Sequence, residues 1–369
     1  MKIAVPIHSF EPGGVERVAL NLCAAWQAQH EQVTVVLGRE AGAMRSSVPA
    51  GLCYAIEPEP VPTAAFETLW MIRLLRRYLA RGQTDVVFAS GNTYGIVAVA
   101  MKLLLGRRCP PIVLKLSNDL YRKDMPAPYR AAYHLWLRAQ GRWLDHFVGM
   151  AQPMRAEIAE LMRVPGDRIT VIEDPSLEEG QYAALIALPR SAGVRAPDYI
   201  AVGRLAGQKN FPMLLRAFAR IGDPDAQLTI LGEGPERGRL EQLAAELGIA
   251  DRLHLPGHIA DPLPYLARAS VFVLSSDYEG VPAVVIEALA AGLPIAATDC
   301  AASMRQLTGD GQFGLLVPPR EPAQLAQAMQ AALTMPYDPA AARRSAQPYR
   351  IDKACAAYRA LFATVAAPH

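Results

Sequence analysis

Glu279 and Glu287 are two carboxylates whose spacing within the stretch 271–299 is suited to binding chemistry. The stretch reads as an apolar strand, a polar loop, an apolar segment of helical length that Pro282 opens, and a second strand. Glu279 therefore falls at the carboxyl end of a strand, where open α/β sheets bind ligands, and Glu287 falls in the helix. The amides of residues 280–284 can bind an anion, and a carboxylate can accept hydrogen bonds from a ribose diol. This pattern predicts a site for a nucleoside diphosphate, with an ordinary strand-helix-strand unit as the alternative.

A second group of charged residues lies in a glycine-flanked loop, 203–210, which follows an apolar strand predicted over 199–202. Arg204 and Lys209 stand five residues apart in this loop. Two such cations can share one diphosphate, because arginine binds it through a planar fork and lysine as a point charge. The alternative is a solvated basic loop.

These two segments resemble signatures of a known family. The sequence EGVP at 279–282, followed by EALAAGLP at 287–294, is similar to the E-x7-E signature of the retaining nucleotide-sugar glycosyltransferases of family 4. The loop 203–209 is similar to the G-R-x(4)-K segment of the same family, and other matches extend along most of the chain. The family has the GT-B fold, in which two Rossmann-like domains face a cleft.

The resemblance implies a role for each of these charged residues. It assigns Glu287 to the ribose hydroxyls of the donor and Glu279 to the donor sugar, and it assigns the two cations to the pyrophosphate. It also implies that the turn at 257–259 packs around the base. The implied catalytic residues are Glu279, Arg204 and Lys209. The implied donor-binding residues are Gly14, Arg204, Lys209, Gly257, His258, Ile259, Glu279, Gly280, Val281, Pro282 and Glu287.

The first half of the chain offers candidates for the acceptor side of the cleft. Gly13 and Gly14 permit close backbone approach at the start of a predicted helix, and the family has a Gly-Gly-x-Glu at this point. Asn92 and the pair Ser117 and Asn118 follow later strands at their carboxyl ends. Many members of the family have a histidine where Ser117 or Asn118 stands, and this chain departs from the family there. Neither His8 nor His134 is favoured as a substitute.

The elements that position these residues alternate between strand and helix, as in doubly wound α/β sheets. We expect a first, acceptor-binding Rossmann-like domain over 1–185 and a second, donor-binding one over 186–350. A C-terminal helix within 351–369 is expected to pack back on the first domain. The stretch 176–197, rich in charge, alanine and proline, reads as the linker. The predicted strands are 2–7, 33–37, 85–89, 112–116, 147–150, 169–172, 199–202, 227–232, 271–274 and 294–298.

Composition limits the class of protein. The chain has 369 residues, more than a single core usually holds, and 51% of them are hydrophobic. No apolar run is long enough to span a bilayer, and the first residues do not resemble a signal peptide. The five cysteines form no ligand spacing, which favours a reducing cytoplasm over disulfides or a cysteine metal site. We expect a cytoplasmic protein that binds no metal.

Positive charge is concentrated between residues 70 and 142, which hold thirteen Lys or Arg and three Asp. These cations alternate with large apolar and aromatic residues at helical spacing, a pattern typical of membrane-surface helices. A solvated helix face is the alternative. Nucleic acid is disfavoured because the net charge is only +2 and no nucleic-acid motif occurs. The segment therefore favours peripheral contact with the inner face of a membrane.

The resemblance implies a retaining glycosyltransferase that needs no metal or cofactor and uses a nucleotide-diphosphate sugar as co-substrate. We expect transfer of a hexose-type sugar from UDP or GDP to a hydroxyl. The basic, aromatic first half favours a lipid-linked or cell-envelope polysaccharide acceptor. One alternative is another GT-B enzyme, such as a nucleotide-sugar epimerase, although the cleft segments show no histidine-carboxylate pair. The other is a non-catalytic nucleotide-sugar-binding relative, although such a protein would have less reason to retain all four charged residues.

Overall fold

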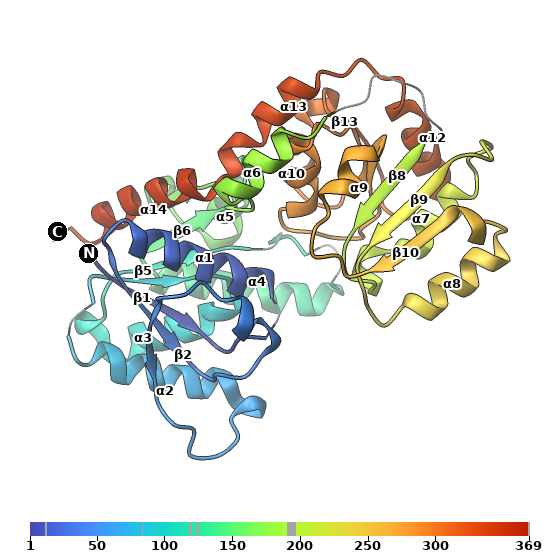
Figure 1. Cartoon of the computed structure of the whole chain (residues 1–369). Helices are drawn as coiled ribbons and strands as arrows, with labels where there is room; N and C mark the ends of the chain where they lie inside the picture. The colour runs from blue at the N-terminus through green and yellow to red at the C-terminus, as the bar shows by residue number, and fades with distance from the viewer. Residues whose placement is uncertain (12, 83, 118–119, 123–124, 190–196, 368–369) are drawn as a thin grey trace. The chain divides into compact units, whose positions relative to one another are not determined.

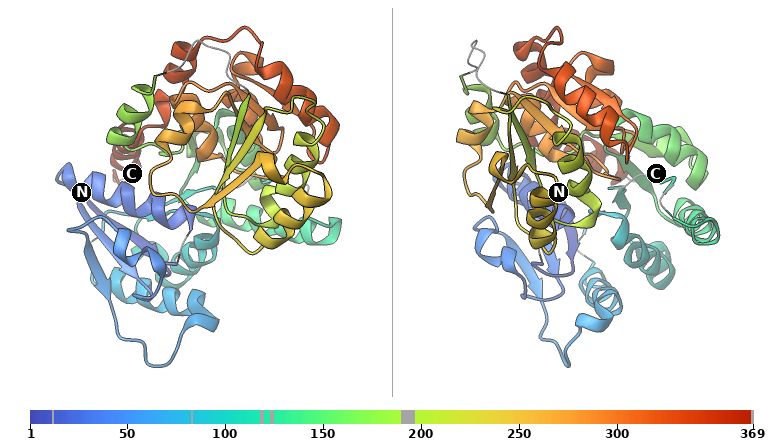
Figure 2. Two further views of the ribbon diagram at one scale, coloured as in Figure 1. Left: turned by 45° about the vertical axis from the view of Figure 1, so that its right-hand side comes forward. Right: turned by 90° about the vertical axis from the view of Figure 1, so that its right-hand side faces the viewer.

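The computed structural model describes residues 1–11, 13–82, 84–117, 120–122, 125–189 and 197–367. The chain forms two compact units, one of Met1–Pro175 with Ile351–His369 and the other of Ser176–Arg350. Each unit is a parallel sheet covered by helices (Figures 1 and 2). No helix of the described residues is both long and apolar enough to cross a membrane.

The sheet of the first unit has seven parallel strands in the order β3-β2-β1-β4-β5-β6-β7. Its central strands β4, β5 and β6 are buried at every residue, which fits their mostly apolar sequences, with Lys115 and His146 as the polar exceptions. The strand order reverses between β1 and β4, and this switch point is where such sheets bind ligands. The strands are β1 (Lys2–Ile7), β2 (Gln32–Leu37), β3 (Cys53–Ile56), β4 (Val86–Ala89), β5 (Ile112–Lys115), β6 (His146–Gly149) and β7 (Ile169–Val171).

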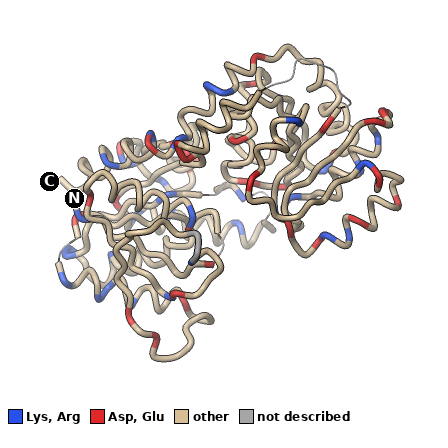
Figure 3. Tube along the Cα trace, viewed as in Figure 1, with Lys and Arg blue, Asp and Glu red and all other residues tan. Residues whose placement is uncertain are grey.

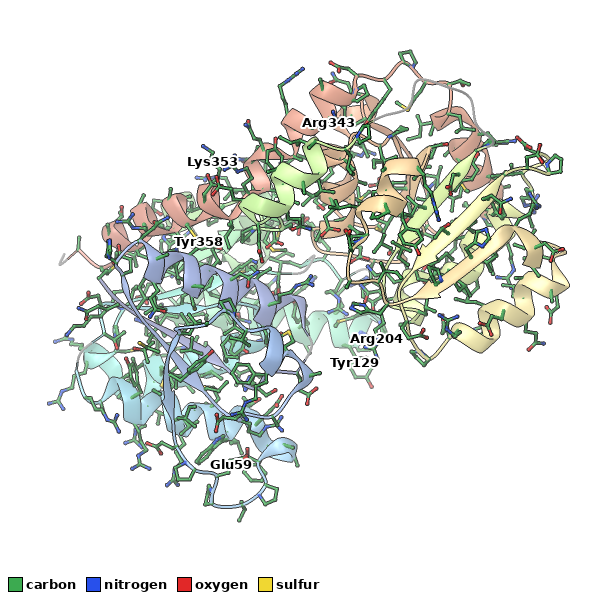
Figure 4. All side chains as sticks on the ribbon, viewed as in Figure 1. Glu59, Tyr129, Arg204, Arg343, Lys353 and Tyr358 are labelled. Carbon is green, nitrogen blue, oxygen red and sulfur yellow. The ribbon has the colours of Figure 1, made fainter. Side chains whose placement is uncertain are left out.

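Helices cover the first sheet in two groups. Helices α2 to α5 pack against one another in chain order, and α14 packs on α1. The α1–α14 contact is aromatic, since the Trp26 ring lies 5.7 Å from that of Tyr358 and 5.3 Å from that of Phe362 (Tyr358 is labelled in Figure 4). These helices are α1 (Gly14–Ala28), α2 (Glu67–Leu79), α3 (Gly95–Leu105), α4 (Ala127–Trp143), α5 (Gln152–Met162) and α14 (Ile351–Val365).

The second unit has six parallel strands in the order β10-β9-β8-β11-β12-β13, with the switch point between β8 and β11. The strands are β8 (Asp198–Val202), β9 (Gln227–Leu231), β10 (Leu253–Gly257), β11 (Val271–Leu274), β12 (Ile295–Thr298) and β13 (Gly314–Val317). The helices are α6 (Glu179–Ile186), α7 (Phe211–Phe218), α8 (Arg237–Glu246), α9 (Leu263–Arg268), α10 (Ala283–Ala290), α11 (Met304–Leu307), α12 (Pro322–Ala332) and α13 (Pro339–Ser345). The two parallel sheets confirm the predicted α/β class.

Two elements differ from the sequence-based expectations. The stretch 176–197 is not a plain linker, because it contains α6, which packs against α10 inside the second unit. The units accordingly divide at residue 175, whereas the sequence suggested 185. Helix α6 has only eight residues, too few to show a helical period clearly. The short strand β3 was also missed, because its burial is incomplete and its pattern therefore weak.

Candidate functional site

The loops after β8 and β11 meet at the switch point of the second sheet. Lys209 Nζ lies 2.6 Å from Glu279 Oε1, and Ser276 Oγ donates to the same oxygen at 2.7 Å. The two side chains are 18% and 11% exposed, so their attraction is screened less than that of a surface pair. The structure thus joins a cation and a carboxylate that stand 70 residues apart in the sequence.

Asp277 joins the same two loops from the other side. Its Oδ1 accepts from Asn210 Nδ2 at 2.8 Å, and its backbone amide donates to the Gln208 carbonyl at 2.9 Å. Its Oδ2 accepts from Arg320 at 2.8 and 3.2 Å, a pair that raises the pKa of the arginine. Asn210 has a left-handed backbone (φ +45°) and caps α7 by accepting from the Met213 amide. Asp277 therefore holds the turn that carries Lys209 in place.

Arg204 lies two residues after the end of β8 and is exposed (labelled in Figure 4). Its side chain makes no ion pair or hydrogen bond with any residue that the structure describes. The loop around it is held closely by the turn after β9: a Cβ at Gly232 (φ +143°) would lie 1.9 Å from the Gly203 carbonyl oxygen. A Cβ at Gly234 would lie 2.4 Å from the Leu205 carbonyl oxygen. An unpaired guanidinium on a firmly held loop is well suited to bind an anion.

Glu287 lies on α10 and is partly buried. Its Oε1 accepts a hydrogen bond from Gln181 Nε2 at 3.0 Å. Gln181 belongs to α6, whose Tyr182 hydroxyl also donates to the carbonyl of Arg343 at 3.2 Å. A helix that was read as linker therefore orients the carboxylate that the family resemblance assigns to a ribose.

The loop that leads into α10 is held by hydrogen bonds that its backbone atoms make with residues after β12. The amide of Glu279 donates to the Cys300 carbonyl at 3.1 Å, and Ser303 Oγ donates to the Gly280 carbonyl at 2.9 Å. Pro282 precedes the helix with an extended backbone, and Val281 packs against a core cluster. The amides of Gly280 and Val281, and those of the first two residues of α10, have no backbone acceptor among the described residues. They remain available to an anion.

The turn after β10 lies next to the turn after β9, because β10 is the edge strand and pairs with β9. The backbone of Gly257 has a positive φ of 86°, and its carbonyl accepts from the Gly232 amide at 2.8 Å. His258 is exposed, and Ile259 packs against a core cluster. This turn is thus tied by its backbone, while the His258 side chain faces solvent.

In the first unit, Gly13 caps α1, and Gly14 is exposed with open space around it. Asn92 and Ser117 meet: Asn92 Oδ1 accepts from the Ser117 amide at 2.7 Å and from its hydroxyl at 3.1 Å. Gly91 lies against α1, since a Cβ there would be 2.7 Å from Val15 Cγ1. The carboxyl ends of β1, β4 and β5 are thereby brought together. Asn118 lies outside the described residues.

The two histidines of the first unit that were weighed as substitutes for the family's histidine are His8 and His134. The ring of His8 stacks on Tyr94 at 4.8 Å, and the Tyr94 hydroxyl donates to Glu16 Oε1 at 3.2 Å. Burial lowers the pKa of His8, so this ring is neutral at pH 7. His134 is partly buried on α4. His8 is thus buried and packed on Tyr94.

Sequence reasoning missed the residues that support the charged groups. Asp277 was detectable as a carboxylate two residues before Glu279, but its partner Arg320 follows β13, more than forty residues later. Gln181 was not detectable, because nothing in its neighbourhood indicates proximity to Glu287. Tertiary contact alone identifies both.

Comparison with known proteins assigns the family. The model described as Glycosyltransferase Family 4 matches residues 12–174, and that described as Glycosyl transferases group 1 matches residues 196–335. The chain is 37% identical over 332 residues to the N-acetylgalactosamine-N,N'-diacetylbacillosaminyl-diphospho-undecaprenol 4-alpha-N-acetylgalactosaminyltransferase of Campylobacter jejuni. That match covers 86% of this chain and 86% of the relative.

Two solved structures share the fold over nearly the whole chain. The lipopolysaccharide outer core galactosyltransferase WaaB superposes with a TM-score of 0.76 at 17% identity, covering 99% of this chain and 100% of that one. HepE of Anabaena, solved in complex with UDP, also has a TM-score of 0.76, at 16% identity and with the same coverage. The family models, the relative and the shared fold together establish that this chain belongs to the family 4 glycosyltransferases and has the GT-B fold.

Proposed function

We propose that this glycosyltransferase moves a hexose-type sugar, with retention of configuration, from a UDP- or GDP-sugar to a hydroxyl of a lipid-linked or cell-envelope polysaccharide. The observation that carries the proposal is the cluster at the switch point of the second sheet. There Lys209 and Glu279 are paired, Arg204 has no partner among the described residues, and Glu287 accepts a hydrogen bond from Gln181.

The chemistry of this cluster suits departure of a nucleoside diphosphate. Negative charge builds on the leaving diphosphate, and Arg204 can bind it together with the free amides before α10. Lys209 has three N–H donors, of which one is used by Glu279, so it can bridge the sugar-binding carboxylate and the phosphate. Loss of either cation should cost about 2.7 to 4 kcal/mol of transition-state stabilisation, as for a lost oxyanion donor. We propose that these groups do the work for which other transferases use a divalent metal.

The names of the relatives support the substrate classes. The Campylobacter relative is named for transfer to a sugar on diphospho-undecaprenol, which is a lipid-linked acceptor. A relative in Rhizobium meliloti, 37% identical over 122 residues, is named as a lipopolysaccharide core biosynthesis glycosyltransferase. The solved structure of HepE holds UDP. We accordingly place the acceptor in the same chemical class and UDP first among the donors.

Calorimetric titration with UDP, GDP and ADP, each with and without EDTA, tests the donor site. We expect one nucleotide to bind with EDTA present and to bind at least tenfold more weakly to Glu287→Ala, because the variant loses hydrogen bonds to a charged group. Glu246→Ala, an exposed carboxylate on α8, is the matched control and should bind as wild type.

Binding that requires a metal, or that is equal in the two variants, would contradict the donor-site assignment. If a nucleotide-sugar is consumed only when an acceptor is added, transfer is supported over epimerisation. The anomeric configuration of the isolated product, read by nuclear magnetic resonance, then tests retention.

A further inference from the structure

The outer surface of helices α2, α3 and α4 exposes an unusual amount of apolar side chain. Leu69 and Leu135 are each 67% exposed, and Tyr129, labelled in Figure 4, is 72% exposed. The other exposed members are Ile96, Leu103, Leu104 and Trp143. By contrast, the exposed large apolar residues in the described part of the second unit are Ile186, Tyr278 and Leu333. Apolar surface gathered on three neighbouring helices marks an interaction surface rather than scattered exposure.

The same three helices are almost free of acidic residues. Helices α3 and α4 contain no Asp or Glu, and the one acid of α2, Glu67, pairs with Arg39 at 3.1 Å. The exposed cations on and just after these helices are Arg73, Arg76, Arg77, Arg81, Arg107, Arg108, Arg138 and Arg142. Of these eight, Arg77 pairs with Glu57, and the other seven form no ion pair with any described residue. The surface therefore has an uncompensated positive charge.

The position of these cations follows from the fold. Crossover helices run antiparallel to the parallel strands, so α2, α3 and α4 all end at the edge of the sheet where the strands begin. Each helix carries its arginines near that end and its apolar residues mainly before them. In Figure 3 several Lys and Arg segments accordingly lie together at the left-hand end of the first unit. This edge is opposite to the one where Asn92 and Ser117 meet.

Helix stabilisation accounts for only part of this arrangement. Cations in the last turn favour the helix dipole, and this alone would justify one or two arginines per helix. It does not account for Leu103 and Leu104, which are 58% and 51% exposed directly before Arg107 and Arg108. Apolar side chains next to cations are what a surface needs to insert into the headgroup region of an anionic bilayer.

We propose that the outer face of α2, α3 and α4 binds the surface of a membrane that contains anionic phospholipid. The leucines enter the boundary between headgroups and acyl chains, and the arginines contact the headgroup phosphates. This inference rests on the proposed function in one respect: a lipid-linked acceptor lies at such a surface.

Co-sedimentation with lipid vesicles, without nucleotide or acceptor, tests the surface. The vesicles contain phosphatidylcholine alone or an equal mixture with phosphatidylglycerol, at low and high salt. We expect the full chain to bind the mixed vesicles at low salt and to be released by high salt, because exposed charges are screened within a few ångströms there.

Two variants separate the contributions. Arg107→Gln combined with Arg108→Gln should lower the partition coefficient of the protein onto mixed vesicles about 30-fold. Each cation contributes a factor of slightly more than about five, and the two factors multiply. Leu103→Ser with Leu104→Ser should lower it at either salt concentration, because apolar insertion is not screened. Arg216→Gln with Arg220→Gln, exposed residues on and after α7 in the second unit, is the matched control and should bind as wild type.

The proposal is overturned if wild-type protein does not bind the mixed vesicles, if it binds phosphatidylcholine alone equally well, or if both surface variants bind undiminished. Full displacement from the mixed vesicles by RNA at low concentration would also overturn it, in favour of a nucleic-acid surface. Circular dichroism of each variant verifies folding. Nucleotide binding by the same variants distinguishes failure of this surface from failure of the proposed function, because the donor residues other than Gly14 lie in the second unit.

Discussion

Removal of the Asp277 side chain should weaken donor binding although Asp277 is not placed among the donor contacts. Asp277→Ala breaks the hydrogen bond to Asn210 and the pair with Arg320, leaving the turn that carries Lys209 less firmly held. A hydrogen bond to a charged group contributes about 1.5 to 3 kcal/mol, and the Asp277 side chain is only 18% exposed, so little of this is lost to solvent. Nucleotide affinity should therefore fall by at most about 10- to 100-fold in Asp277→Ala.

The two partners of Asp277 should contribute unequally. The Arg320 side chain is 77% exposed, so solvent screens most of its attraction to Asp277. Arg320→Ala should therefore weaken binding less than about fivefold, whereas Asn210→Ala, which also removes the cap of α7, should approach Asp277→Ala. The loss of affinity should therefore be largest in Asp277→Ala and smallest in Arg320→Ala, because Asp277 is partly buried and Arg320 is exposed.

Calorimetry with the nucleoside diphosphate that binds wild type, together with steady-state kinetics, measures these effects. Loosening of the turn should lower the fraction of binding-competent protein, which raises the donor KM more than it lowers kcat. Asp225→Ala, an exposed carboxylate in the connection between β8 and β9, is the control. Wild-type affinity in Asp277→Ala, or an equally large loss in Arg320→Ala, would refute the reasoning.

Three further predictions concern other contacts. Gln181→Ala should weaken nucleotide binding about tenfold, because Glu287 loses the hydrogen bond from Gln181. The variant should also show a smaller preference for UDP over its 2′,3′-dideoxy analogue. An unchanged preference would exclude a role of Gln181 in positioning Glu287. Burial lowers the pKa of His146 from 6.5 to about 4, so the unfolded chain binds more protons in this range. Stability should therefore fall as pH falls from 6.5 to 4, and thermal melts of His146→Asn should lack this part of the decline. Lys115→Met, which breaks the buried pair with Asp174, should cost about 3 to 5 kcal/mol in urea unfolding, and full stability in this variant would contradict that role.

Much of the site could be predicted because its parts are local in sequence. The strand at 271–274, the loop with Glu279 and the helix with Glu287 are all confirmed as β11, a loop and α10. An apolar run bounded by glycine and proline determines such a unit by itself, because the pattern and the chain breaks are short-range properties. The family resemblance depended on the same short segments.

The sequence was less informative where the pattern was short or contradictory. Helix α6 was read as linker, since eight residues rich in alanine give little periodicity. Its fold depends on burial of Tyr182 and Leu185 in the core of the second unit. Such a helix is stabilised mainly by tertiary packing, not by its own propensity.

The sequence by itself indicated the class of fold, most of its strands and helices, and the residue types proposed to carry the chemistry. Only the tertiary structure decided which of them meet: Lys209 with Glu279, Asp277 with Asn210 and Arg320, and Gln181 with Glu287. The reason is physical. Secondary-structure propensity and the period of apolar residues depend on a few neighbouring residues. Hydrogen bonds and ion pairs between distant loops depend instead on the strand order, which decides which side chains come within about 3 Å of each other.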